Sequence, residues 1–222
     1  MKTNKFTYLF MTLLLILLTA TPAWAYIPFK AEYLVESRYK LAPSVNLTHE
    51  IRWRAGMYHV SMEAGNSLVS WRENSRFTLS DTALPVSKDF RSRTRVIQNR
   101  NDRKLSFDGR NDGRNDGILD RQTLVFALPL IAQQRGVGAS GMLESLNHRG
   151  REKNIEYFVH ELLDYEGSRA ALIDVWFEGK PDELLGRVYF SLEVPGLILH
   201  AEAFDEDGRS LGTLKLTHWS PI

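Results

Sequence analysis

Four Asp residues in one segment are evenly spaced, a pattern that could bind a cation. The sequence FDGRNDGRNDGILDRQTL covers residues 107–124, and its acids lie four residues apart at Asp108, Asp112, Asp116 and Asp120. An EF-hand loop needs ligands at positions one, three and five and a Glu at position twelve. Counting from the first acid puts Arg110 at position three and Leu119 at position twelve. The intervening glycines also disfavour a helix that would align the acids. We therefore expect no metal here, but a turn lengthened by one tandem Arg-Asn-Asp-Gly unit.

A row of arginines could bind anions. Arg91, Arg93 and Arg95 alternate along one strand-like segment, so their side chains share a face. Guanidinium groups pair well with phosphates and carboxylates, which makes this row a candidate contact for phosphates or acidic sugars of envelope glycolipids. The alternative is a solvated outer face whose charge discourages edge-to-edge pairing of sheets. Both interpretations fit the sequence.

Two segments have the letters of known functional motifs, but neither has the neighbouring secondary structure that the motif requires. GVGASG, residues 136–141, has the letters of the dinucleotide fingerprint, but a helical pattern precedes it where a strand is required. HELLD has Asp164 where a zincin carries its second His, and its strand-like setting would separate that acid from His160. Nucleophile-elbow and P-loop sequences are absent, and no pair of acids suits glycoside cleavage. We predict no cofactor and no metal, and we lean towards a non-enzymatic protein.

The first 25 residues have the form of a signal peptide. A basic start precedes an apolar run over residues 6–20, and an A-x-A cleavage site ends at Ala25. The apolar run is shorter than the roughly 20 residues of a spanning helix, and no second such run follows, so we expect no transmembrane helix after cleavage. The chain has no cysteine, which excludes disulfides, thiolate catalysis and lipoprotein acylation. These features predict export to a bacterial periplasm.

The remainder, residues 26–222, is long enough for one sizeable core, and nothing in it marks a linker. Loss of Lys2 and Lys5 with the leader changes the formal net charge from +1 to −1. A nearly neutral chain gives no reason to expect nucleic acid as a partner. An outer-membrane barrel is disfavoured because the outer strand faces are charged. We therefore predict a single domain.

Alternation of apolar and polar residues predicts a mainly β fold. A helical pattern interrupts it only over residues 120–135, with Asp120 as N-cap, Gly136 as the stop and Pro129 expected to kink or divide the helix. We expect a single antiparallel, strongly curved sheet, a half-barrel or barrel of about ten strands, with this helix plugging or flanking it. The predicted strands cover residues 29–38, 45–54, 57–64, 75–79, 86–97, 155–162, 171–177, 187–193, 197–204 and 211–219, and a further strand ends at Phe107.

Several segments resemble a family of exported bacterial proteins catalogued as domain of unknown function 3108. They are PFKAEYLVESRY, LTHEIRWRAGMYHVSMEA, ENSRFTLSDTALPVSKDF, LDRQTLVFALPL and GRVYFSLEVPGLILHAEAFDEDGRSLGTLKLTHW, and together they cover most of residues 28–219. The sequence departs from the family where Val188-Tyr189-Phe190 replaces a strand that commonly carries Trp. The resemblance implies a curved antiparallel sheet and supplies no catalytic residues. By analogy of fold it also suggests the lipoprotein-carrier and lipocalin-like half-barrels that hold acyl chains.

We expect a non-catalytic periplasmic protein of the cell envelope that binds a lipid or other hydrophobic ligand in its curved sheet. The alternatives are an enzyme of envelope polymers, which would need a cluster of His and carboxylate side chains, and an interaction scaffold with an unidentified protein partner. In the scaffold, the bulky apolar residues simply fill the core. The candidate cavity residues are Leu47, Ile51, Trp53, Tyr58, Val60, Met62, Trp176 and Trp219.

Overall fold

The computed structural model describes residues 26–38, 44–65, 69–96, 99–106, 118–146, 151 and 153–222. The predicted signal peptide at residues 1–25 lies outside the described residues. So does the tandem loop at 107–117, with Asp108, Asp112 and Asp116, and the expectation of a metal-free turn there stays a prediction.

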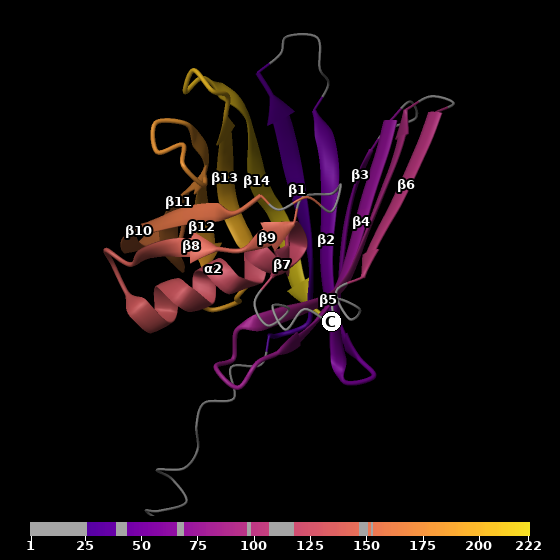
Figure 1. The fold of residues 1–222 in the computed structure, drawn as a ribbon, viewed down its shortest axis with the longest axis horizontal. Coiled ribbons are helices and arrows are strands. Elements are labelled where there is room, and N and C mark those ends of the chain that lie inside the picture. Colours follow the sequence, from indigo (N-terminus) through magenta and orange to yellow (C-terminus); the bar gives the residue numbers. More distant parts are fainter. Residues whose placement is uncertain are drawn as a thin grey trace, which may run out of the picture.

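Twelve strands form one antiparallel sheet, in the order β6-β5-β4-β3-β2-β1-β14-β13-β12-β11-β10-β8 (Figure 1). The predicted mainly β fold, with a single large antiparallel sheet, is confirmed. A short parallel pair, β7 (Leu119–Asp120) with β9 (Ser145–Leu146), lies beside it. The strands are β1 (Phe29–Ser37), β2 (Val45–Arg54), β3 (Met57–Gly65), β4 (Val69–Leu79), β5 (Pro85–Val96), β6 (Asn99–Ser106), β8 (Ser140–Leu143), β10 (Ile155–Tyr165), β11 (Ser168–Phe177), β12 (Leu184–Ser191), β13 (Ile198–Phe204) and β14 (Ser210–Pro221).

The helix α2 spans Arg121–Arg135 and ends at Gly136, which adopts a φ of 78°. Asp120 is its N-cap, accepting hydrogen bonds from the backbone N–H groups of residues 122 and 123, as predicted. The helix is continuous through Pro129, so of the two predicted effects of this proline, a kink or a division, the division does not occur. Proline removes one donor from the i→i−4 ladder, and the buried face of the helix on both sides of it is held by packing.

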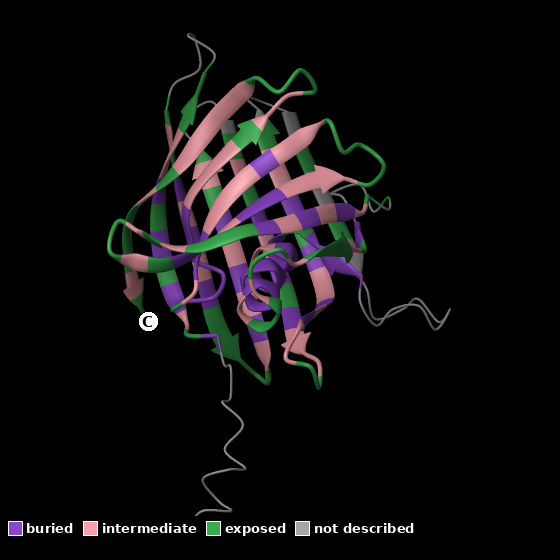
Figure 2. Cartoon of the chain, turned by 90° about the vertical axis from the view of Figure 1, so that its left-hand side faces the viewer, coloured by how far each residue is buried: buried purple, intermediate pink, exposed green. Residues whose placement is uncertain are grey.

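The sheet lies on more than one side of α2, as Figure 2 shows with the helix seen nearly end-on. The ring of Phe126 lies 5.2 Å from that of Phe77 in β4, and a Cβ added to Gly196, just before β13, would overlap with the same ring. In a flat sheet β4 and β13 would lie about 24 Å apart, because neighbouring strands are spaced by about 4.8 Å. One phenylalanine can touch both sides only because the sheet bends around the helix.

The main core lies between α2 and the strand faces that turn towards it. Phe126, Leu130 and Ala132 of the helix are buried there together with Phe29 of β1 and Ile51 of β2. The rings of Tyr26 and Phe77 pack against Phe126 and against each other, and the ring of Tyr58 packs against both Tyr26 and Phe77. The ring centroids of these pairs lie 5.1–5.4 Å apart. Among the described residues, no helix is long and apolar enough to cross a membrane.

Candidate ligand pocket

A pocket of about 480 Å³ lies between α2 and strands β10–β13. It arises because the helix uses two faces. Phe126 and Leu130 pack into the main core, and Leu124 belongs to a separate apolar cluster. Leu128 belongs to the main core and also lines the pocket with Leu124. The volume is within the range of about 300–1,000 Å³ that is usual for small-molecule sites. Its walls are predominantly apolar and include Leu124, Leu128, Val175, Phe177, Leu185 and Phe190.

Arg121, at the start of α2, is one of two cations that line this pocket. Its Nε donates to Glu73 Oε2 at 2.6 Å, and its Nη2 pairs with the other oxygen of the same carboxylate. The guanidinium carbon also lies 5.4 Å from the Trp71 ring and 5.9 Å from the Phe90 ring. Burial lowers the pKa of Arg121 to about 10, so the side chain stays charged at neutral pH. Glu73 is fully buried and neutralises that charge.

The second cation, Lys153, is placed differently. Its backbone is fixed to β9, because its N–H donates to Ser145 O at 2.9 Å and its carbonyl accepts from the Ser145 hydroxyl. Its ammonium lies 3.5 Å from the centroid of the Phe177 ring, a cation–π contact. No described residue makes an ion pair with Lys153. A second hollow, of about 490 Å³ and with a more polar lining, shares Lys153, Phe177 and Leu185 with the apolar pocket. Lys153 therefore stands at the border between the two hollows.

A buried polar network docks the first turn of α2 on the other half of the sheet. Asp120 Oδ2 accepts from Ser75 of β4 at 2.7 Å, from Ser87 of β5 at 2.8 Å and from the Thr123 hydroxyl at 2.7 Å. Burial raises the pKa of Asp120, and these hydrogen bonds act in the opposite direction because they favour the carboxylate. Gln122 Nε2 donates to Glu73 at 2.9 Å. The network positions the helix and hence one wall of the pocket.

The eight predicted cavity residues lie outside this pocket. Leu47, Ile51, Tyr58, Val60 and Met62 are buried in the main core, in contact with other core residues. Trp53 and Trp219 are exposed, and Trp176 is half-buried. The pocket uses residues of α2, β11 and β12 instead. Alternation of side chains correctly identified the inward strand faces, but it does not encode which face the helix covers.

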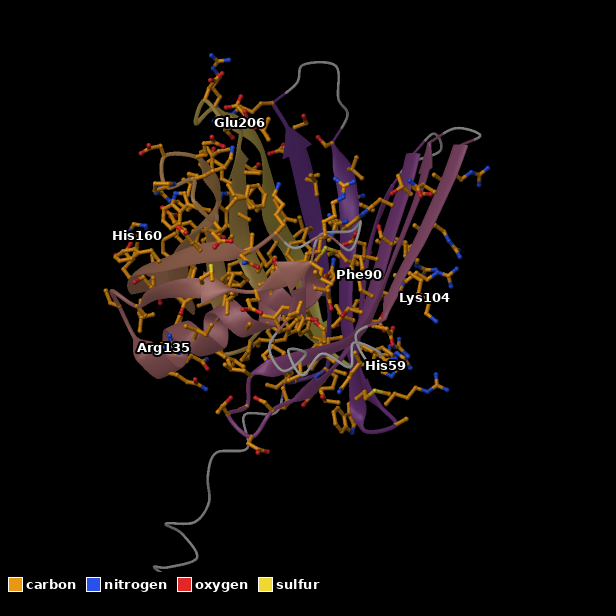
Figure 3. The ribbon with its side chains drawn as sticks, viewed as in Figure 1. His59, Phe90, Lys104, Arg135, His160 and Glu206 are labelled. Atoms are coloured by element: carbon orange, nitrogen blue, oxygen red, sulfur yellow. The ribbon has the colours of Figure 1, made fainter. Side chains whose placement is uncertain are left out.

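The predicted arginine row lies on the face of β5 opposite to the buried Phe90 and Ser92. Arg91 and Arg95 are exposed and Arg93 is half-buried, and all three interact with neighbouring groups. In the β-ladder, Arg93 is directly opposite Arg72 of β4, and Arg91 is directly opposite Lys104 of β6. Figure 3 shows Lys104 pointing away from the helix.

His160 of the HELLD segment contacts Asp174, an acid outside that segment. His160 Nε2 lies 2.9 Å from Asp174 Oδ2, while Asp164 accepts from the N–H of Gly167 in the following turn. Arg187 donates to both oxygens of Asp174, each at 2.8 Å, and this ion pair raises the pKa of Arg187. His160 projects at the outer edge of β10, away from Phe90 and the helix N-terminus (Figure 3). In the described part of the chain, no group of three His, Cys, Asp or Glu side chains could hold a metal ion.

Comparison with known proteins shows distant resemblance only. No family model matches the sequence, so membership of the family named above stays a prediction, and no curated protein matches it. The crystal structure of MucB is 12% identical over 88% of this chain and 53% of its own, with a TM-score of 0.39. A MucA/MucB complex of Pseudomonas aeruginosa gives 11% identity, over 87% of this chain and 51% of the matched chain, with a TM-score of 0.39. A DUF1329 family protein of Desulfovibrio piger gives 8%, over 89% and 86%, with a TM-score of 0.33. This chain spans about half the length of the MucB chains.

Proposed function

We propose that the protein binds a hydrophobic ligand, such as the acyl chain of a lipid, in the pocket between α2 and β10–β13. The observation that carries this proposal is an open, predominantly apolar hollow of about 480 Å³ beside the main core. An apolar wall left in contact with water forgoes the stabilisation that burial would give it. Occupation by an acyl chain recovers that stabilisation.

The energetics suit a reversible carrier or sensor. Burial of a methylene contributes about 0.8 kcal/mol, so a ten-carbon chain contributes about 8 kcal/mol before the entropic cost of binding is subtracted. Affinities in the micromolar range or weaker follow, since about 8 kcal/mol corresponds to a Kd of about 1 μM. The leader-like sequence at residues 1–25 supports a periplasmic location for this binding role.

The test is to fill the pocket from its half-buried rim. Leu185→Trp inserts a large ring at the pocket wall, and it should weaken binding of a hydrophobic fluorescent dye by tenfold or more. Leu172→Trp is the matched control, because this half-buried position faces the side of β11 opposite to the buried Ile173. Mass spectrometry under native conditions on protein purified from periplasm would identify a co-purifying lipid. Equal dye binding by wild type and Leu185→Trp would contradict the proposal.

A second candidate function is attachment of the outer face of β4–β6 to an anionic surface. On this face Arg72 lies directly opposite Arg93 and Lys104 directly opposite Arg91. Arg72 also pairs with Glu63 at 2.7 Å, and Arg93 has Asp102 as its opposite residue in β6. The many basic side chains on this face would attract phosphate groups of lipids or glycolipids, since guanidinium groups pair well with phosphate.

A further inference from the structure

Two cations line the apolar pocket, Arg121 and Lys153, and they differ in whether an acidic side chain pairs with them. Arg121 is held by the buried carboxylate of Glu73 and by two aromatic rings, so its charge is already satisfied. Lys153 has no acidic partner among the described residues. The neighbouring Lys180 offers a contrast, because its ammonium lies 2.5 Å from Glu183 Oε2. Of these three cations, Lys153 is the one whose charge is available to pair with an anionic group of a ligand.

The position of Lys153 defines where a ligand's head group would lie. Its ammonium rests on the Phe177 ring, and that ring forms part of the wall of both the apolar and the polar hollow. An exposed cation–π contact is weak compared with a charge-assisted hydrogen bond. An ammonium has three N–H donors, so most of its capacity remains for an anion. The backbone contacts with Ser145 hold this residue at the mouth of the pocket.

We propose that the ligand is a single-chain amphiphile with a compact anionic head, a carboxylate or phosphate monoester, held by Lys153. This inference rests on the proposed function. The chain extends along Leu124 and Leu128, and the head contacts the ammonium at the border of the two hollows. The polar hollow beyond carries Glu178, Asp205 and Glu206, which would repel a larger anionic head extending into it. The site therefore favours small anions.

The test compares dodecanoate with dodecanol, measured by displacement of a hydrophobic dye at pH 8. The two probes share one chain, so the ratio of their affinities isolates the head group. Lys153→Gln should reduce that ratio about fivefold or more, because it removes a charge-assisted hydrogen bond, and it should leave dodecanol binding within about twofold of wild type. Lys153→Arg keeps the charge and should retain most of the preference. Lys180→Gln, in the adjacent hollow, is the matched control and should leave the ratio unchanged.

The outcomes separate this inference from the proposed function. If both probes bind and Lys153→Gln leaves their ratio unchanged, the head-group assignment is wrong while the apolar pocket still binds ligand. If neither probe nor dye binds wild-type protein, the proposed function itself fails. If the ratio falls equally in Lys153→Gln and Lys180→Gln, the effect is one of net charge, which also overturns the specific role of Lys153.

Discussion

At the scale of single residues, His49 is the most unusual group in the core. It is fully buried, and neither ring nitrogen has a hydrogen-bond partner in the described part of the chain. Its ring lies 5.3 Å from that of Phe29 and 5.7 Å from that of Phe126. Burial lowers the pKa of His49 to about 3, so the imidazole is neutral in the folded protein. A histidine in this setting makes folding sensitive to acid.

The sign of this effect follows from proton binding. The unfolded chain takes up a proton at His49 near the ordinary pKa of about 6.5, whereas the folded protein does so only near pH 3. The free energy of unfolding therefore falls as the pH drops from about 6.5 towards 3, with a slope of at most about 1.4 kcal/mol per pH unit from this group.

Replacement of His49 by leucine should remove this contribution. Urea unfolding at several pH values between 8 and 3.5 should show that His49→Leu loses less stability on acidification than wild type. The exposed His218→Gln is the control and should keep the wild-type pH dependence. Identical pH profiles for wild type and His49→Leu would show that His49 is protonated in the folded state or contacts water.

At the scale of elements, the contact between α2 and the turn before β13 decides how the helix is held. Gly196 adopts a φ of 91°, and an added Cβ would overlap with the ring of Phe126. Only glycine satisfies both the left-handed backbone and the close approach of the ring. The helix is thus fixed at Asp120 by hydrogen bonds and at Phe126 by packing against a bare backbone.

Gly196→Ala should therefore destabilise the protein by more than its backbone conformation alone explains. Gly208 also has a positive φ, of 72°, but nothing lies within 4 Å of its added Cβ, so Gly208→Ala measures the backbone cost of a left-handed alanine. We expect an additional loss of at least about 1 kcal/mol for Gly196→Ala, measured by urea unfolding. Combination with Phe126→Leu should recover part of that additional loss, since the two positions are in contact. Equal losses for the two alanine variants would contradict this account of helix docking.

The sequence predicted the elements better than the site. Alternation located the strands on both sides of the helix, and Asp120 and Gly136 marked the helix ends, because these signals are local. The short β7, β8 and β9 were missed, since strands of two to four residues show too little periodicity. The pocket was missed because it depends on the position of α2 relative to β11 and β12. Lys153 belongs to no motif, and the role proposed for it depends on Phe177, 24 residues later in the chain.

At the scale of the whole molecule, charge is distributed unevenly over a nearly neutral chain. The outer face of β4–β6 carries Arg72, Arg91, Arg93, Arg95 and Lys104. Each basic residue close to an anionic membrane surface contributes about 1 kcal/mol of attraction at ordinary ionic strength. A local patch can therefore bind an anionic surface that the molecule as a whole does not favour.

Substitution of Arg91, Arg93 and Arg95 by glutamine should reduce co-sedimentation with vesicles containing anionic phospholipid by tenfold or more. Binding of the wild type should weaken as salt increases, since these charges are exposed or half-buried. A triple variant with Arg38→Gln, Arg209→Gln and Lys215→Gln removes the same charge from residues near the β13–β14 side of the sheet and should bind like wild type. Equal weakening in both triple variants would indicate a response to net charge without a defined face.

The pairing of β1 with β14 joins the earliest and latest strands of the sheet. Strands β1–β6 follow one another as neighbours on one side of that pairing, and β10–β14 do so on the other. Each set can form by local hairpin closure, which is fast, whereas the β1–β14 ladder must bridge most of the chain. An incompletely synthesised chain therefore exposes the β1 edge until β14 arrives. The final assembly step is the one at which chaperones, or aggregation with another copy, would compete with folding.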